Sequence, residues 1–410
     1  MSNGDIIVSL DIGTSKVRAI IGELNNGAVN IIGVGSSDSI GIRKGAIVDI
    51  DQTVQSIRKA IDHAERMVGI QISDVYVGIS GNHIALQASH GVVAVSNEDR
   101  EIGDEDVERV LQAAKVIALP PEREIIGIVP KQYLVDGLDD IHDPRGMIGV
   151  RLEVEATIIT GSKTPVHNLI RCVEKSDLHI SGLVLTSLAS SQLALSKDEK
   201  ILGTVLVDIG AGATTIAIFE QDNLTFTTTL PIGGDFITND ISIGLRTEKE
   251  IAEKIKLKYG CALIDQADEN TTFSANRIGN HEEKEFNQLE LAHIIEPRVQ
   301  EIFQLIHNEV RRLKGKEPAG GYVLTGGAVL MPGMINVAEE TLNMPVRIAE
   351  PDFIGVRDAS YTNGVGIILH STNYYKWNSN NQSSTVTNQA SKPAKKNVIQ
   401  RVKDFFKEFI

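Results

Sequence analysis

The feature that most constrains the fold of this chain is a strand, a polar turn and a second strand near its N-terminus. Residues 6–22 read IIVSLDIGTSKVRAIIG, where an apolar run ends at Asp11 and a β-rich run starts at Val17. Two such runs about a small polar turn predict a β-hairpin. The turn combines backbone N–H groups, two hydroxyls and an ammonium, at Gly13, Thr14, Ser15 and Lys16.

Such a turn can bind one phosphate. The carboxylate of Asp11 would repel a phosphate directly, so we expect it to face Mg²⁺ through water. A polar hairpin turn without any ligand explains this stretch at least as well when the stretch is taken alone.

A second copy of the hairpin favours the phosphate interpretation. Residues 205–219 read VLVDIGAGATTIAIF, and their candidate ligands are Asp208, Gly210, Gly212, Thr214 and Thr215. A third turn, within YVLTGGAVLMPG at 322–333, has Gly326 and Gly327, where backbone can approach a base or ribose closely. Repetition at domain spacing predicts two related halves with a nucleotide between them.

Composition narrows the function classes. The formal charge of −14 and the 4% aromatic content argue against a nucleic-acid binder. The cysteines, Cys172 and Cys261, have neither metal-ligand spacing nor a disulfide framework, so we expect a reducing cytoplasm. We expect no signal peptide, because the N-terminus lacks a basic and apolar leader, and no segment that spans a membrane.

The order of elements predicts an α/β fold with an insertion. The first eighty residues read as three strands, a helix at 51–68 and a strand. A separate α+β unit follows, with a helix at 104–118 and strands at 85–95, 124–130, 132–135 and 153–160. In the second half we expect helices at 236–245, 248–259, 296–315 and 355–369.

The end of the chain changes in composition twice. Residues 371–396 are rich in Asn, Ser, Thr, Gln and Lys and predict a disordered linker. Residues 397–410 predict an amphipathic helix of about 21 Å, too short to span a hydrocarbon core of about 30 Å. Its apolar stripe consists of Val398, Ile399, Val402, Phe405, Phe406, Phe409 and Ile410, and its basic residues are Arg401, Lys403 and Lys407. It predicts an interfacial membrane helix, with docking on its own domain or on a partner protein as the alternative.

These motifs resemble those of a known family. Two Asp-Gly hairpins with a Thr-Gly-Gly turn are the pattern of the actin, Hsp70 and sugar-kinase superfamily. Further segments resemble the FtsA family of bacterial cell-division proteins: Lys44-Gly45 with Asp49, AERM at 64–67, VGISG at 77–81, PKQYLVDG at 130–137, PRGMIG at 144–149, RLE at 151–153 and Thr160-Gly161. The resemblance covers residues 5–370 and the C-terminal helix.

The resemblance implies an actin-like (ribonuclease H-like) duplicated α/β fold with an inserted α+β subdomain, called 1C. It divides the chain as follows: 1–83 and 162–200 form subdomain 1A, 84–161 subdomain 1C, 201–233 and 297–355 subdomain 2A, 234–296 subdomain 2B, 356–370 a return helix to 1A, 371–396 a disordered linker, and 397–410 a membrane-targeting helix.

The resemblance also implies ATP with Mg²⁺ in the cleft, held by the three turns, with Asp11 and Asp208 facing the metal through water. Glu253 and Lys256 would reach the ribose or base. Ala211 departs from the glycine usual in the family's second turn. No water-positioning carboxylate is found near Thr186, so we expect at most slow ATP hydrolysis.

The function implied is a peripheral protein at the cytoplasmic face of the membrane, at the division septum. It would polymerise, bind anionic lipid and interact with other division proteins. It would also tether FtsZ, the tubulin-like division protein, to the membrane. The FtsZ tail would bind near Arg246 and Lys249, on a surface predicted to be basic with Lys254, Lys256 and Lys258. A small-molecule kinase of the same superfamily is the alternative. An Hsp70-like chaperone is disfavoured, because it would need a large substrate domain after the ATPase part, and the residues that follow are few and mostly linker.

Overall fold

The fold comprises two compact units. In a computed structural model, residues 5–279 and 283–382 are described, with their side chains as far as 372. One unit is built from the described parts of Met1–Asn82 and His167–Ser371, and the other from His83–Val166 and the described part of Thr372–Ile410. No helix within these described ranges is both long and apolar enough to cross a membrane.

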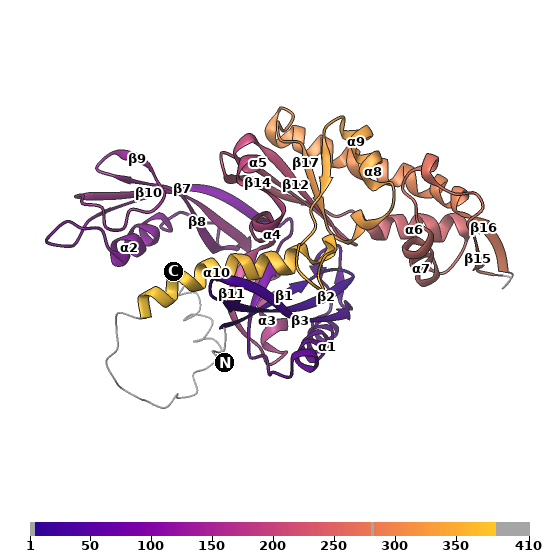
Figure 1. The fold of residues 1–410 in the computed structure, drawn as a ribbon, viewed down its shortest axis with the longest axis horizontal. Helices are drawn as coiled ribbons and strands as arrows, with labels where there is room; N and C mark the ends of the chain where they lie inside the picture. The colour runs from indigo at the N-terminus through magenta and orange to yellow at the C-terminus, as the bar shows by residue number, and fades with distance from the viewer. Residues whose placement is uncertain (1–4, 280–282, 383–410) are drawn as a thin grey trace. The chain divides into compact units, whose positions relative to one another are not determined.

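The first half of the larger unit is a five-stranded sheet in the order β11-β6-β1-β2-β3 (Figure 1). Its strands are β1 (Asp5–Ile12), β2 (Lys16–Asn25), β3 (Ala28–Asp38), β6 (Asp74–Ile79) and β11 (His179–Leu185). The first three form an antiparallel meander, and β6 and β11 run parallel to β1.

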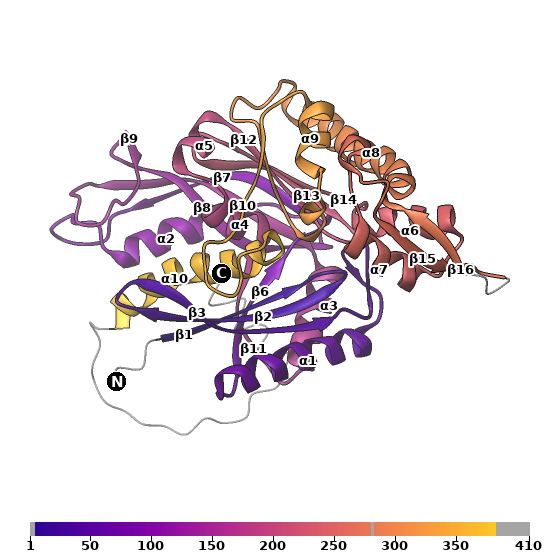
Figure 2. The ribbon, with the colours of Figure 1, turned by 45° about the vertical axis from the view of Figure 1, so that its right-hand side comes forward.

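Helices cover this sheet. They are α1 (Ile50–Val68), α3 (Lys163–Glu174), α4 (Thr186–Ala194) and α10 (Thr362–Gln382). Helix α1 runs along the face of β2 and β3 (Figure 2). It begins where the Asp49 carboxylate accepts a hydrogen bond from the Gln52 N–H at 3.0 Å and ends at Gly69, which has φ 77°. The two-residue strands β4 (Ile42–Arg43) and β5 (Ala46–Ile47) form a small hairpin before it.

The second half repeats this topology. Its sheet has the order β14-β13-β12-β17-β18, again a three-stranded antiparallel meander followed by two parallel strands. The strands are β12 (Thr204–Ile209), β13 (Thr214–Glu220), β14 (Asn223–Leu230), β17 (Tyr322–Thr325) and β18 (Val346–Ile348). The helices are α5 (Lys197–Leu202), α6 (Gly234–Leu245), α7 (Lys249–Tyr259), α8 (Gln288–Lys314) and α9 (Met334–Leu342). The predicted duplicated α/β fold is confirmed.

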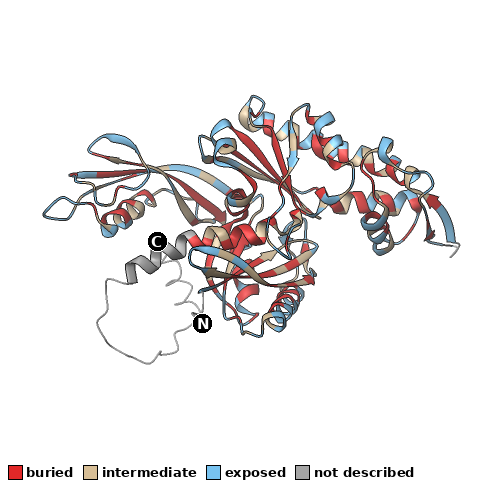
Figure 3. Ribbon diagram, viewed as in Figure 1, coloured by how far each residue is buried: buried red, intermediate tan, exposed pale blue. Residues whose placement is uncertain are grey.

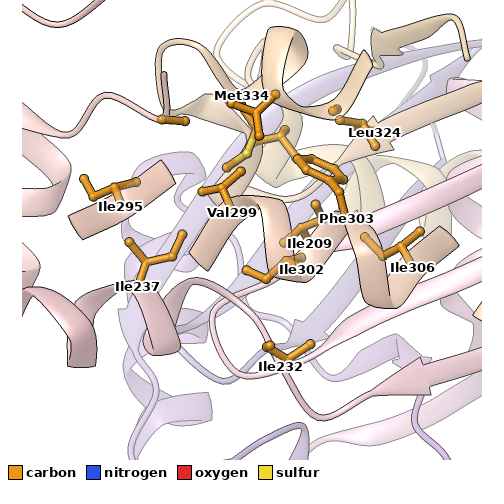
Figure 4. Close-up of a cluster of buried hydrophobic side chains, with 14 of the residues drawn as sticks. Ile209, Ile232, Ile237, Ile295, Val299, Ile302, Phe303, Ile306, Leu324 and Met334 are labelled. Atoms are coloured by element: carbon orange, nitrogen blue, oxygen red, sulfur yellow. The ribbon is translucent and has the colours of Figure 1, made fainter. Parts of the chain in front are cut away.

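The core of the second half lies between its sheet and helix α8. Strands β12 and β13 are buried along almost their whole length (Figure 3). Figure 4 shows Phe303 and Ile302 of α8 beside Ile209 of β12 and Leu324 of β17, all at most 2% exposed. The short strands β15 (Thr272–Asn276) and β16 (Glu283–Asn287) complete this half.

Helix α8 begins eight residues earlier than the predicted start at Glu296. Its N-terminus is a reciprocal cap, in which Asn287 accepts from the Glu290 N–H and Glu290 accepts from the Asn287 N–H. Pro297 therefore lies inside the helix instead of opening it.

The smaller unit is a four-stranded antiparallel sheet with one helix, in the order β7-β10-β8-β9. Its elements are β7 (Ile84–Ala94), α2 (Asp104–Ala114), β8 (Arg123–Val135), β9 (Leu138–Ile141) and β10 (Arg151–Ser162). The two strands predicted at 124–130 and 132–135 are one strand, because a bulge opposite Glu155 and Ala156 accommodates Lys131 without breaking the ladder. Strand β9 was not predicted, and α2 ends four residues before Ala118.

The linker boundary predicted at Ser371 is wrong. Helix α10 begins at Thr362, not at the predicted 355 or 356, and continues to Gln382, with Ser371 and Thr372 buried. Each added helical residue gains a backbone hydrogen bond, so a packed helix extends into polar sequence whose composition alone indicates disorder. The rest of the predicted linker, 383–396, and the predicted amphipathic helix, 397–410, lie outside the described residues.

Candidate functional site

The two predicted hairpins have the same geometry. In the first turn the Gly13 N–H donates to the Lys16 carbonyl at 3.0 Å, and in the second the Gly210 N–H donates to the Ala213 carbonyl at 3.0 Å. Each turn therefore has four residues between the last pair of the ladder. Asp11 stands opposite Arg18 and Asp208 opposite Thr215, at equivalent positions of the two ladders.

The turns face each other within the larger unit. A Cβ on Gly212 would lie 2.8 Å from the Thr14 hydroxyl oxygen and 3.0 Å from the Lys44 nitrogen, so only glycine fits this approach. The Thr14 hydroxyl also accepts a hydrogen bond from the Gly45 N–H at 3.1 Å. The segment at Lys44-Gly45, noted above only as a family motif, thus borders both hairpin turns.

The third predicted turn meets the second one at Asp208. Gly326 has φ 96°, and a Cβ there would lie 2.4 Å from Oδ1 of Asp208. The turn is held by the hydroxyl of Thr325, which donates to the Ala359 carbonyl at 3.0 Å, and by the Gly326 N–H, which donates to the same carbonyl at 3.2 Å. All three sequence-predicted turns are therefore brought together.

The two carboxyl groups lie in surroundings that disfavour their charge. Burial raises the pKa of Asp11 from its ordinary value of 3.8 to about 6; nearby Arg18 opposes the rise and Asp208 adds to it. Burial likewise raises the pKa of Asp208, against the hydrogen bond from Asn363 and the charge of Arg18. A divalent cation near both groups would stabilise their ionised forms.

Carboxylate oxygens are ligands that suit Mg²⁺, so the donor chemistry of Asp11 and Asp208 fits that ion. Across the described part of the chain, however, no group of three or more His, Cys, Asp or Glu side chains could hold a metal ion. A Mg²⁺ ion here would therefore need phosphate oxygens and water as further ligands, which is the usual arrangement for nucleotide-bound Mg²⁺.

Sequence reasoning missed Arg18 and selected Lys16 as the cation of the first turn. The Lys16 ammonium forms an ion pair with Asp38 at 2.5 Å, whereas the charge of Arg18 opposes the rise in the pKa of both carboxyl groups. An Arg18 nitrogen donates to the Ser360 hydroxyl at 2.9 Å, and the guanidinium lies 5.0 Å from the centre of the Tyr361 ring. Its Nε is buried without a hydrogen-bond partner. The sequence did contain a signal for Arg18. The predicted hairpin pairs its two strands, and this pairing places residue 18 opposite Asp11.

The predicted ribose or base residues lie on α7, beside the second turn. The Lys256 ammonium donates to the Gly234 carbonyl at 3.2 Å and to the Thr238 hydroxyl at 2.8 Å, and pairs with Glu253 at 2.7 Å. The Gly234 N–H donates to the Gly210 carbonyl at 3.0 Å, which links this cluster to the turn. Lys256 is only 9% exposed, so the prediction that it belongs to the basic surface near Arg246 and Lys249 is wrong. Its ammonium is drawn inward by these acceptors.

Two protein-family models match parts of the chain. Residues 205–366 match the model described as "Cell division protein FtsA". Residues 81–160, most of the smaller unit, match the model described as "SHS2 domain inserted in FTSA".

Curated relatives match over most of the chain. Cell division protein FtsA of Bacillus subtilis (strain 168) is 52% identical over 368 residues, which cover 90% of this chain and 84% of the relative. The chain belongs to the FtsA family. FtsA of Escherichia coli (strain K12) is 36% identical over 88% of this chain and 89% of the relative. The family predicted from the sequence motifs is confirmed.

Solved structures outside the FtsA family share the fold at low identity. The PilM-PilN type IV pilus biogenesis complex matches with a TM-score of 0.61 and 15% identity, over 89% of this chain and 98% of that one. MreB 5 of Spiroplasma citri bound to AMPPNP matches with a TM-score of 0.56 and 13% identity, over 92% and 98%. These likenesses confirm the predicted actin-like fold.

Proposed function

We propose that this member of the FtsA family binds ATP with Mg²⁺ between its two repeated halves. The observation that carries the proposal is the pair of matched hairpin turns, which face each other and carry Asp11 and Asp208 at equivalent positions. Backbone N–H groups and hydroxyls of the turns would bind the phosphates. Gly326 and Gly327 would lie against the adenosine. Mg²⁺, when bound, would neutralise phosphate charge.

The same site favours a nucleotide clamp over a fast hydrolase. The start of α4, where the sequence predicts no water-positioning carboxylate, has the hydroxyls of Thr186 and Ser187. Hydroxyls at their ordinary pKa are weak general bases at neutral pH. We infer that hydrolysis is slow at most.

A small-molecule kinase would need a carboxylate base in a substrate pocket, and phosphorylation of a sugar or acetate in a coupled assay would support that alternative.

We propose further that the protein assembles with copies of itself and with FtsZ at the division septum. Family membership supports a role in cell division. A double helical filament formed by MamK has the same fold, with a TM-score of 0.52 and 11% identity. The smaller unit is the proposed contact to the next subunit. Arg246 and Lys249, both exposed, are the proposed anchors for the FtsZ tail.

The proposed attachment to the cytoplasmic face of the membrane rests on residues 397–410. Their stripe of three phenylalanines with four aliphatic residues, flanked by basic side chains, has the pattern of an interfacial helix on anionic lipid. One such helix binds weakly, so several tails on one polymer would be needed for firm attachment.

Sedimentation with anionic lipid vesicles tests the whole proposal. The protein should pellet with vesicles, pellet more completely when ATP and Mg²⁺ promote assembly, and carry FtsZ into the pellet. FtsZ that stays in the supernatant while the protein itself pellets would contradict the tethering function.

A further inference from the structure

A side chain from the end of the chain holds the Asp208 carboxylate. Asn363 is the second residue of α10, and its amide Nδ2 donates to Oδ2 of Asp208 at 2.8 Å. Its amide oxygen accepts from the Ser190 hydroxyl at 2.6 Å. Ser190 lies on α4 in the first half, whereas Asp208 is the penultimate residue of β12 in the second. Asn363 therefore joins the two halves directly behind the nucleotide turns.

The chemistry of its partners fixes which way the Asn363 amide points. The ionised carboxylate of Asp208 only accepts hydrogen bonds, so the NH₂ group of Asn363 faces it in this state. The amide oxygen then faces a hydroxyl that can donate. Ser190 is 2% exposed, and its single hydroxyl proton is shared between the Asn363 amide oxygen and the Thr186 carbonyl, each 2.6 Å away, so this partner is itself held in place.

Packing leaves the Asn363 side chain little freedom. The adjacent residues of α10, from Gly364 to Ile368, are buried, and Gly366 meets the backbone of Ala189 so closely that a Cβ would lie 2.5 Å from its carbonyl oxygen. The small cavity bounded by Ser190, Asp208 and Asn363 has a volume of about 10 Å³, room for roughly one water molecule. Neither the helix nor the amide can move far from the carboxylate.

This arrangement assigns different tasks to the two Asp208 oxygens. Oδ2 is engaged by Asn363, while Oδ1 lies beside Gly326 of the adenosine turn. We propose that Asn363 is a positioning residue, which orients the Asp208 carboxylate toward the Mg²⁺ of a bound Mg²⁺–nucleotide. The inference rests on the proposed function. Partners that orient a metal-facing ligand typically change metal affinity by about 10–100-fold when they are removed.

The test separates this role from simple packing by measuring ATP affinity in excess Mg²⁺ and in EDTA. Asn363→Ala should lose about 10–100-fold of the affinity measured with Mg²⁺. Its affinity without the metal should stay within about threefold of wild type. Ser190→Ala, which removes only the support of the amide, should show the same selectivity with a smaller loss.

Asn336→Ala is the matched control. Asn336 is also a helical asparagine, but it is exposed on α9, and its amide oxygen accepts from the Gln266 side chain at 3.2 Å. It should behave as wild type under both conditions.

Three results would overturn the inference. Unchanged Mg²⁺-dependent affinity in Asn363→Ala would show that the amide does not act on Asp208. Equal losses with and without Mg²⁺, in both Asn363→Ala and Ser190→Ala, would indicate a structural role. A wild-type protein that binds no ATP under either condition would contradict the proposed function as well, which distinguishes that failure from the first two.

Discussion

At the scale of single residues, the site is built from carboxylates placed where charge is costly. Asp11 and Asp208 lie within reach of the same guanidinium, that of Arg18, and burial raises the pKa of both. A folded protein that retains such groups gives up stability for binding. The cost should therefore be measurable without nucleotide.

Asn in place of Asp11 should stabilise the protein when no nucleotide is bound. The folded protein holds the Asp11 proton up to a pH of about 6, whereas the unfolded chain releases it near 3.8, so stability falls as pH rises through this window. The full penalty above pH 6 is at most about 3 kcal/mol, and contact with water reduces it to about 1–2 kcal/mol. Asp11→Asn should gain that amount in urea unfolding at pH 7.5 and nothing at pH 4.

Asp265→Asn, at an exposed position, is the control and should change little at either pH. A stability gain for Asp11→Asn that is the same at pH 4 and pH 7.5 would contradict a cost caused by ionisation.

At the scale of elements, the repeated Asp-Ile-Gly segments made the two hairpins predictable down to the turn. A local pattern can do this because turn residues and alternation specify a hairpin without distant contacts. Arg18 and Asn363 were not predictable in the same way. Their partners, Ser360 for one and Ser190 with Asp208 for the other, are distant in sequence and meet only through the sheet topology.

The two wrong element boundaries have different causes. Pro297 marks a helix start by local rules, yet the cap at Asn287 begins α8 two turns earlier. Likewise Ser371 begins a polar stretch, but packing of the preceding apolar turns carries α10 beyond it. At α8 one local signal, the reciprocal cap of Asn287 and Glu290, prevails over another, and only at α10 does tertiary packing override local composition.

The close approach of the turns gives an element-scale prediction. Gly212→Ala should push the second turn away from Thr14, because the added Cβ would overlap the Thr14 side chain. We expect a loss of about 1–3 kcal/mol in unfolding free energy, typical of overpacking, together with weaker ATP binding. Denaturant unfolding and calorimetry measure the two effects.

Gly127→Ala is the control, since its Cβ would meet nothing nearer than 3.8 Å. Wild-type stability and ATP affinity in Gly212→Ala would show that the two turns do not approach each other as described.

At the scale of the whole molecule, the proposed activities occupy separate parts of the chain. The proposed nucleotide site lies within the larger unit, the proposed FtsZ anchors lie at α6 and α7, and the proposed lipid helix is at the C-terminus. Separate locations imply that each activity can be removed alone.

Reversal of Arg246 and Lys249 to Glu should weaken binding of an FtsZ tail peptide by at least about tenfold, equivalent to about 1.4 kcal/mol. Both side chains are exposed, so the melting temperature should not change. Fluorescence anisotropy of a labelled peptide measures the affinity. The double variant Lys59→Glu, Arg66→Glu on α1 makes the same charge change at another exposed surface. Equal binding by the two double variants would place the peptide elsewhere.

Removal of residues 397–410, or Phe406→Glu, should release the protein from anionic vesicles while ATP affinity stays as in wild type. The substitution places a charge in the apolar stripe, which must enter the acyl boundary. Glu408→Gln leaves the stripe intact and should still pellet. Full pelleting of the truncated protein would refute the membrane anchor.

The most direct test of the central claim, a nucleotide between two repeated halves, is calorimetric titration of Mg²⁺–ATP into wild type, Asp11→Ala and Asp208→Ala. The account predicts one site per chain and at least about tenfold weaker binding in each variant, because each half contributes one carboxylate that faces the metal. If either variant keeps wild-type affinity, the nucleotide is not held from both sides, and the two-sided site is wrong.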